Sequence, residues 1–317
     1  METMKIVIVT PVFNDWTSFK KLSREIDASL ASEEDVDYTM LVINDDSSVM
    51  PNLEDVPSKV RLLHLTCNLG HQRAIAVGLS HLADEEEFDA VIVMDADGED
   101  KPSDLPRMLQ AHRKKQGAIV VARRDKRSEG GTFRLGYSIY RAMFRLFTGK
   151  HLPFGNFSLI PSSAVRRLVY EESIWNHLAA TILKSRFELV MLSTQRGQRY
   201  QGQSQMNLSS LTLLGLSAIS VYSDLALLRT LIGSLAMSSV AVLGIFVTTY
   251  IRLFTDFAIP GWASDVVGSM AIILFQSLVL SVFLLFIVLS NRSQRGFVAA
   301  RHYEDYVLLI EDFTLRK

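Results

Sequence analysis

Residues 90–100 read Ala-Val-Ile-Val-Met-Asp-Ala-Asp-Gly-Glu-Asp, an uninterrupted apolar run that ends in a cluster of carboxylates. An apolar strand without alternation is typical of a parallel sheet that helices cover on both faces. Ligands of such sheets bind beyond the carboxyl ends of the strands, which is where Asp95, Asp97, Glu99 and Asp100 fall. Asp95 and Asp97 are one residue apart, so an extended backbone points both carboxylates the same way. This stretch predicts an α/β fold with an acidic site at one sheet edge.

The same alternation of short apolar runs and helical stretches fills the chain up to residue 206. We expect further strands at Lys5–Val9, Thr39–Ile43, Arg61–Leu65 and Ala118–Ala122, and helices at about Asp15–Leu30 and Gln72–Ala83. Asp45 and Asp46 follow the second strand of the chain. Two acidic clusters at one sheet edge repel each other unless a cation or hydrogen-bond donors lie between them. Surface turns also use Asp-x-Asp, so the position after buried strands is what favours a divalent-metal site.

Two segments near the C-terminus are uncharged and long enough to span a bilayer, Thr230–Ile251 and Val266–Ser290, since roughly 20 apolar residues cover the hydrocarbon core. A pair of buried helices in a soluble core is the alternative, which the short loop between the two runs disfavours. Arg229 precedes the first segment, and Arg292 and Arg295 follow the second. The positive-inside rule then places both the N-terminal domain and the C-terminal tail in the cytoplasm.

The chain therefore divides into four expected parts. We expect a cytoplasmic domain over residues 1–206, interfacial helices over 207–229, two transmembrane helices over 230–290 and a cytoplasmic tail over 291–317. A helix packed on the soluble domain is the alternative for the second part. The single cysteine, Cys67, cannot form an internal disulfide, which fits a reducing compartment. No signal-peptide pattern precedes the first strand.

Four sequence elements, taken in order, carry a family resemblance. They are Val9-Thr10-Pro11-Val12-Phe13-Asn14, Ile43-Asn44-Asp45-Asp46-Ser47-Ser48, Asn68-Leu69-Gly70 with Ala74, and Met94-Asp95-Ala96-Asp97. This set resembles glycosyltransferase family 2, whose fold is GT-A. With the membrane hairpin added, nearly the whole chain is similar to the polyprenyl-phosphate glycosyltransferases, a dolichol-phosphate mannose synthase-like group that includes bacterial undecaprenyl-phosphate sugar transferases. The resemblance implies a Rossmann-like, mostly parallel sheet flanked by helices, then interfacial helices and a two-helix transmembrane hairpin.

The resemblance also implies a reaction, the inverting transfer of a sugar from a UDP- or GDP-linked donor to undecaprenyl or dolichyl phosphate. The nucleotide-sugar contacts that it implies are Pro11, Asn14, Asp45, Asp46, Asn68, Gly70, Asp95 and Ala96. Mg²⁺ or Mn²⁺ would be held by Asp97 and Asp95, with Glu99 where relatives often place a third oxygen ligand. Mg²⁺ takes one or two carboxylates and fills its shell with phosphate oxygens and water, which agrees with this set.

A basic stretch and a later segment supply the implied acceptor side. The acceptor-phosphate residues that match the family are Arg124, Arg127, Arg134, Ser138, Arg199 and Ser204. Of these, Arg134 and Arg199 join Asp95 and Asp97 as the implied catalytic residues. Arginine suits the task because its planar fork binds phosphate oxygens in pairs. A solvated helix face or a patch on anionic lipid is the alternative for the basic stretch.

Several positions depart from the family pattern, including Ser47 in place of the commoner Gly and Ser158 in place of an Arg. Asn156 stands where relatives commonly have an acid, and an Asn cannot act as a general base. A lipid phosphate is already ionised near neutral pH, so this departure fits a phosphate acceptor. Gln205 stands where the family usually has Lys. His71 takes a position often held by Gln, and we do not expect it to bind a metal because no second His or Cys lies at useful spacing.

Other functions stay open at this point. A degenerate relative that binds a nucleotide-sugar or a partner without turnover is supported by Asn156 and Gln205. A polysaccharide synthase is disfavoured because no Gln-x-x-Arg-Trp element occurs around Gln195–Tyr200. A channel or transporter is disfavoured by spans without charges. We expect an integral protein of the bacterial inner membrane, compatible with a homo-oligomer and without a nucleic-acid partner. The donor sugar and its base are not readable.

Overall fold

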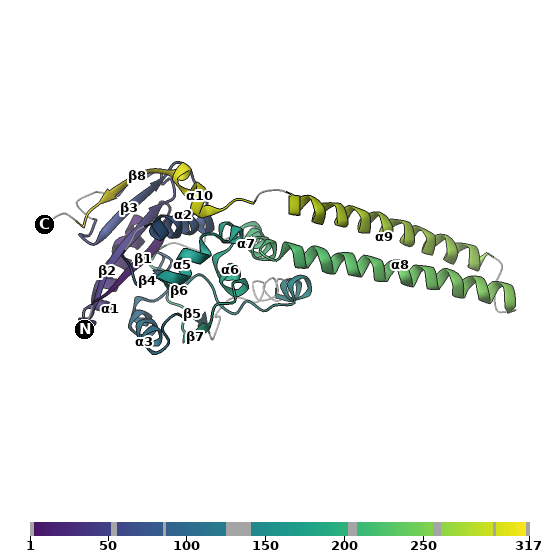
Figure 1. Ribbon diagram of the computed structural model, residues 1–317, viewed down its shortest axis with the longest axis horizontal. Coiled ribbons are helices and arrows are strands. Elements are labelled where there is room, and N and C mark those ends of the chain that lie inside the picture. The colour runs from purple at the N-terminus through teal and green to yellow at the C-terminus, as the bar shows by residue number, and fades with distance from the viewer. Residues whose placement is uncertain are drawn as a thin grey trace. The chain divides into compact units, whose positions relative to one another are not determined.

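The computed structural model describes residues 3–51, 56–84, 87–124, 141–201, 208–255, 261–293 and 296–314. The chain forms two compact units. The first consists of Met1–Tyr140, His151–Val221 and Phe297–Lys317, and the second of Arg141–Lys150 and Tyr222–Gly296. Figure 1 shows a sheet with helices in the first unit and long helices in the second.

An eight-stranded sheet is the centre of the first unit within the described residues. Its strands are β1 (Met4–Val12), β2 (Val36–Asn44), β3 (Val60–Leu65), β4 (Ala90–Val93), β5 (Ile119–Arg124), β6 (Ser158–Pro161), β7 (Leu189–Thr194) and β8 (Val307–Asp312), in the order β7-β5-β6-β4-β1-β2-β3-β8. Strand β1 runs parallel to β2 and β4, β2 to β3, and β5 to β7. Strands β6 and β8 pair antiparallel to their neighbours. The predicted mostly parallel α/β fold is confirmed.

Helices cover both faces of this sheet (Figure 1). On one face lie α1 (Trp16–Leu30) and α3 (Leu105–Lys114). On the other lie α2 (His71–Asp84), α5 (Ser162–Leu168) and α6 (Leu178–Lys184). Successive strand residues point to opposite faces, so Ile8 joins the first core and Val9 the second, both fully buried. Burying an aliphatic side chain of this size stabilises the fold by about 1.5–3 kcal/mol.

The residues after the second apolar helix return to the first unit. Helix α10 (Ala299–His302) and the short 3₁₀ turn Tyr303–Tyr306 pack on the core that contains α2, through buried Ala299 and Tyr303. Strand β8 then extends the sheet beyond β3, and buried Phe313 joins the core of α1 and α3. The segment expected only as a tail therefore contributes a strand and three buried core residues.

The second unit contains the long helices α8 (Ser223–Phe254) and α9 (Trp262–Ser293), which include the expected spans Thr230–Ile251 and Val266–Ser290 and extend beyond them at both ends. Both are long and apolar enough to cross a membrane. The Ser234 hydroxyl lies 2.7 Å from that of Ser281, and Ser238 donates to Ser277 at 3.1 Å, so the helices run antiparallel. Their outward residues are large and apolar, such as Phe246 at 69% exposure. An exposed apolar surface of this extent fits lipid better than water.

Candidate functional site

The acidic loop, residues 95–100, begins directly after β4 and is shaped by its own carboxylates. The backbone N–H of Asp95 donates to Asp100 Oδ2 at 3.1 Å, and that of Glu99 donates to Asp97 Oδ1 at 2.9 Å. Gly98 has φ +85°, a conformation that L side chains rarely adopt. The loop gathers the four acidic side chains at the carboxyl end of β4, where an open α/β sheet binds its ligands.

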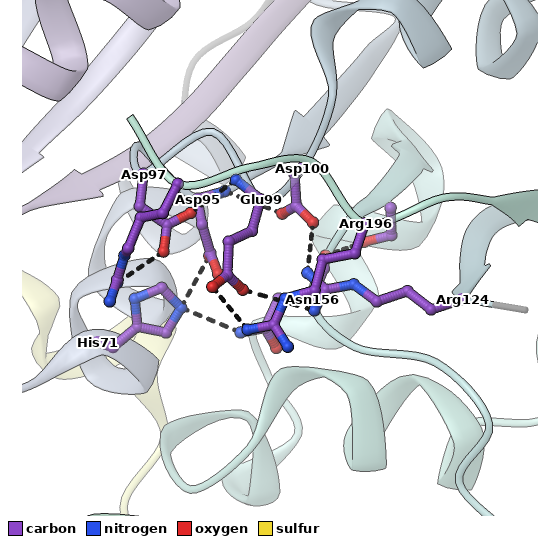
Figure 2. Close-up of polar contacts among 10 residues, drawn as sticks. His71, Asp95, Asp97, Glu99, Asp100, Arg124, Asn156 and Arg196 are labelled. Atoms are coloured by element: carbon purple, nitrogen blue, oxygen red, sulfur yellow. Dashed lines mark hydrogen bonds and ion pairs between the residues drawn. The ribbon is translucent and has the colours of Figure 1, made fainter. Parts of the chain in front are cut away.

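A second segment, the strap (residues 195–201), lies against the acidic loop. Arg199 Nη2 donates to Asp97 Oδ2 at 2.7 Å, and Arg196 Nη2 donates to Glu99 Oε1 at 2.6 Å. All four side chains are less than a third exposed, so solvent screens these ion pairs less than it would on an open surface. Figure 2 shows Arg196 pointing toward Glu99. The strap thus brings two guanidinium groups onto two of the expected metal ligands.

Main-chain contacts also hold the strap in place. The N–H of Gly197 donates to the carbonyl of Glu99 at 2.8 Å, and that of Tyr200 to the carbonyl of Asp97 at 2.9 Å. The Tyr200 ring packs so closely on Gly98 that a Cβ at that position would come within 2.7 Å of ring atoms. Tyr200 also donates from its hydroxyl to Glu25 at 2.6 Å. Only glycine at position 98 permits this close approach.

Arg124 and His71 approach the acidic loop as further cationic partners (Figure 2). Arg124, at the end of β5, donates to Asp100 Oδ1 at 3.0 Å and lies 3.6 Å from Glu99 Oε2. His71, the first residue of α2, has Nε2 3.1 Å from Asp95 Oδ1. Each of the four carboxylates in the loop therefore has a basic partner from another part of the chain.

Burial and mutual repulsion perturb these acids in different directions. Burial and the charge of Asp95 raise the pKa of Asp100 to about 7, although Arg124 acts in the opposite direction. Burial and Asp95 also raise the pKa of Asp97. For Asp95, burial favours the protonated form, but the positive charges of His71 and Arg124 outweigh it and hold its pKa below the usual range. A carboxylate that stays ionised while crowded by other acids attracts a cation.

His71 links the acidic loop to Asn156. Its Nε2 lies 3.1 Å from Asn156 Nδ2 as well as from Asp95 Oδ1. Desolvation favours a neutral His71 ring, but the carboxylates of Asp95, Asp100 and Asp97 raise its pKa above the ordinary value. Two of the residues that depart from the family pattern, His71 and Asn156, therefore touch each other beside the acidic loop.

The loop after β2 uses Asp45 to fix a neighbouring turn. Asp45 is 4% exposed, and its two carboxylate oxygens accept the N–H groups of Leu69 at 2.7 Å and Gly70 at 2.9 Å. Burial raises the pKa of Asp45, and these two hydrogen bonds act against that rise. Asn68 Nδ2 donates to the Asp45 carbonyl at 3.1 Å. Asp46 is exposed, with φ +59°. Asp45 thus organises the turn, and Asp46 faces outward.

The remaining expected donor residues lie close by in the fold. Pro11 is buried in β1, and Asn14 is exposed just beyond the end of that strand. Ala96 is buried within the acidic loop, at 7% exposure. The parallel register pairs Pro11 with Ile43 and Val12 with Asn44, so the loops after β1 and β2 leave the sheet side by side. The expected nucleotide residues are therefore grouped at one sheet edge.

The acidic loop supplies oxygen donors of the kind that a hard divalent cation prefers. Asp95 Oδ1 is buried and lies 3.1 Å from His71 Nε2, and a carboxylate oxygen keeps a second lone pair for a cation. Within the described ranges, no three acidic, His or Cys side chains converge as they would around a bound ion. The arginines account for this, because Asp97 and Glu99 turn toward the strap. The donor set fits Mg²⁺ or Mn²⁺ once those ion pairs are released.

Part of the expected acceptor side lies outside the described residues, namely Arg127, Arg134, Ser138 and Ser204. Arg124 and Arg199 are described, and both contact acidic side chains. Sequence reasoning did not assign roles to Arg196, Asp100 or Tyr200. Arg196 could have been found from its place in the same basic segment as Arg199, and Asp100 from its place in the acidic run.

Comparisons with known proteins agree with this geometry. The family model described as glycosyl transferase family 2 matches residues 7–174. The protein named uncharacterized glycosyltransferase YkcC, from Bacillus subtilis (strain 168), is 26% identical over 293 residues, covering 87% of this chain and 85% of its own. The undecaprenyl-phosphate 4-deoxy-4-formamido-L-arabinose transferase of Erwinia tasmaniensis is 27% identical over 287 residues, covering 86% and 83%.

Solved structures of one protein share the fold. Glucosyl-3-phosphoglycerate synthase from Mycobacterium tuberculosis, in complex with Mn²⁺, UDP-glucose and phosphoglyceric acid, aligns with a TM-score of 0.50 at 16% identity, covering 70% of this chain and 80% of that one. The same protein with Mn²⁺, UDP and phosphoglyceric acid aligns with a TM-score of 0.51 at 14% identity, covering 70% and 78%. At these identities the likeness concerns the fold, the GT-A arrangement expected from the sequence.

Proposed function

Because the chain belongs to glycosyl transferase family 2, we propose that it transfers a sugar from a nucleotide-sugar to a polyprenyl phosphate, with inversion at the anomeric carbon. The observation that carries this proposal is the acidic loop after β4 with two strap arginines against it. Carboxylates for a metal-bound diphosphate and guanidinium groups for a phosphate acceptor then lie side by side. A relative named as an undecaprenyl-phosphate sugar transferase, similar over most of both chains, supports the choice of acceptor.

On the donor side, Asp46 and Asn14 would contact the nucleotide, because both are exposed at the ends of paired strands. Asp45 would hold the turn at Leu69 and Gly70 that borders the same site. Asp95, Asp97 and Glu99 would hold Mg²⁺ or Mn²⁺, which neutralises charge on the departing diphosphate when bound.

On the acceptor side, Arg199 and Arg124 would orient the lipid phosphate, together with Arg134. A phosphate oxygen attacks the anomeric carbon while the bond to the nucleoside diphosphate oxygen breaks on the opposite face, so the configuration inverts. The nucleophile carries its negative charge already, and no side chain needs to remove a proton. Asn156 therefore suits this reaction, since it touches His71 beside Asp95 without adding another negative charge.

The apolar helices α8 and α9 would keep this chemistry at a membrane surface. A polyprenyl chain then stays in the bilayer while its phosphate reaches the site, which raises the effective acceptor concentration. We place the first unit on the cytoplasmic side, from Arg229, Arg292 and Arg295 at the ends of the apolar segments. The bacterial inner membrane is the proposed location.

A transfer assay on purified, detergent-solubilised protein tests the proposal. It contains Mg²⁺ or Mn²⁺, a panel of labelled UDP- and GDP-sugars, and either undecaprenyl phosphate or undecaprenol. We expect label in the lipid fraction with the phosphate and none with the alcohol. Equal labelling of the alcohol would contradict a phosphate acceptor. Nucleotide binding without transfer from any donor would point to a binding protein without turnover.

A further inference from the structure

We propose that Glu311, on the C-terminal strand, is a positioning residue for the donor loop (residues 44–48) and acts through His64 and Asn44. Strand β8 pairs antiparallel with β3, with His64 opposite Leu309. Glu311 Oε2 lies 3.1 Å from His64 Nε2. Glu311 comes after the apolar helices in the sequence and outside the region that the family model matches. The inference rests on the proposed function, in which the donor loop binds the nucleotide.

In the series of contacts from Glu311 through His64 to Asn44, the hydrogen bonds of Asn44 determine which atoms donate and which accept. Asn44 Oδ1 accepts the N–H of Ser47 at 3.0 Å, so the Asn44 amide nitrogen is the group that faces His64. Asn44 Nδ2 lies 3.0 Å from His64 Nδ1, and an amide nitrogen only donates. His64 Nδ1 must therefore accept, which leaves the ring proton on Nε2, pointing at Glu311. Both His64 and Asn44 are buried, at 4% and 3% exposure.

From Asn44 the contacts continue into the donor loop. The Ser47 hydroxyl accepts the N–H of Asn14 at 2.9 Å. Asn14 Oδ1 in turn accepts from the Ser48 hydroxyl at 3.1 Å and from the Val49 N–H at 3.2 Å. Each bond joins the loop after β2 to the loop after β1. Glu311 is thus connected by successive hydrogen bonds to both loops that are expected to contact the nucleotide.

These two loops need such support because their backbones are unusual. Asn14 has φ +54° and Asp46 has φ +59°, in the left-handed region that favours glycine. Non-glycine residues keep this conformation only where surrounding contacts hold it. Ser47 follows Asp46 directly and is bonded to Asn44 and Asn14. A change at Glu311 would therefore alter how Asp46 and Asn14 are presented to a ligand.

The experiment measures the Kd of UDP, and of GDP where UDP does not bind, to the full chain in Mg²⁺. Glu311→Ala leaves the buried His64 N–H without its protein partner, and we expect the Kd to rise about threefold to tenfold. Glu311→Gln should restore wild-type affinity, since its amide oxygen accepts the same proton. The control is Asp312→Ala on the same strand, whose side chain accepts from Thr314. In the transfer assay the donor KM should rise with little change in kcat.

Two outcomes would overturn the inference. One is an unchanged Kd in Glu311→Ala, and the other is an equal loss in Asp312→Ala, which would show general fraying of β8. If Glu311→Ala melts at a much lower temperature than wild type, the nucleotide affinities of Asn44→Ala and of the double variant Glu311→Ala/Asn44→Ala are measured as well. Coupled positions give a combined loss smaller than the sum of the single losses, and additive losses overturn the inference. A wild-type chain that binds neither nucleotide would remove the proposed function itself.

Discussion

Arg199 Nη2 lies 2.7 Å from Asp97 Oδ2, so a side chain expected to bind the acceptor phosphate is paired with one expected to bind the metal. The two roles are compatible if Asp97 and Arg199 break their contact during the reaction, so that Asp97 binds the metal and Arg199 binds the phosphate. A cation at Asp97 would release Arg199, which then becomes available to a phosphate. In the proposed reaction, loading of the donor side would thus prepare the acceptor side.

Replacement of Arg199 should therefore have opposite effects on metal affinity and on transfer. We expect Arg199→Gln to bind Mn²⁺ alone about threefold to tenfold more tightly than wild type, because Asp97 loses a competing cation that is only partly screened. Its transfer rate should fall, because the acceptor phosphate loses a contact. The control is Lys115→Gln, which also removes one positive charge, in this case from an exposed ion pair with Glu188. Unchanged or weaker Mn²⁺ binding in Arg199→Gln, measured by calorimetry, would refute the competition.

The close packing of Tyr200 on Gly98 should be necessary for the strap to dock. Gly98→Ala places a Cβ 2.7 Å from the Tyr200 ring, and we expect transfer to fall at least about tenfold as the strap shifts. Gly117→Ala is a matched control, since Gly117 has φ +86° and a Cβ there meets nothing within 4 Å. Both variants incur the left-handed backbone strain. Equal transfer rates in the two would show that strap contact does not matter.

Acid should destabilise the first unit through His177. This side chain caps α6 by accepting the Ala180 N–H, and burial, helped by the charge of His71, lowers its pKa to about 4. The unfolded ring takes up a proton near pH 6.5, so this stability is present above pH 6.5 and is lost as pH falls toward 4. The loss is about 3 kcal/mol in full.

The variant His177→Asn separates the effect of His177 from that of other titrating groups, because Asn also caps a helix but does not take up a proton. We expect wild type to lose more stability than the variant between pH 7 and pH 4.5, measured by thermal melting in detergent. Parallel pH profiles for the two proteins would rule out His177 as the cause.

The serine contacts between α8 and α9 should depend on close helix approach. Ser238 is 7% exposed and bonded to Ser277, so Ser238→Leu forces a large side chain between the helices. Overpacking of this kind costs about 1–3 kcal/mol. Ser239→Leu makes the same change on an exposed position of α8 and should leave the melting temperature near that of wild type. A similar melting temperature for the two variants would argue against a tight hairpin.

Strands whose residues are apolar on both faces could be predicted from the sequence. Strand β4 and the carboxylates of Asp95 and Asp97 are adjacent in the chain. Their position at the carboxyl end of the strand could therefore be predicted as soon as the strand was. Strands β6, β7 and β8 were not predicted, and for β8 nothing in Val307–Asp312 indicates which strand it joins after a long helical excursion. Pairing with β3 depends on the core contacts of Tyr303 and Phe313.

The candidate site likewise has features that could be predicted from the sequence and features that could not. The grouping of acids after neighbouring strands followed from the parallel order of the sheet. The pairing of Arg196 with Glu99 did not, because the path of the strap depends on backbone contacts such as that of Gly197 to the Glu99 carbonyl. The inward orientation of Asp45 was equally hidden, since a carboxylate after a strand can bind a ligand or its own neighbouring turn.

Mass spectrometry of the lipid product is the most direct test of sugar transfer to a lipid phosphate. Purified protein is incubated with undecaprenyl phosphate, Mn²⁺ and the donor that labels lipid best, with Asp97→Asn in parallel. The proposed transfer should give a phosphodiester with the mass of the lipid phosphate plus one glycosyl residue, reduced about a hundredfold or more in the variant. Free sugar and nucleoside diphosphate without any lipid product, or an equal yield from Asp97→Asn, would contradict it.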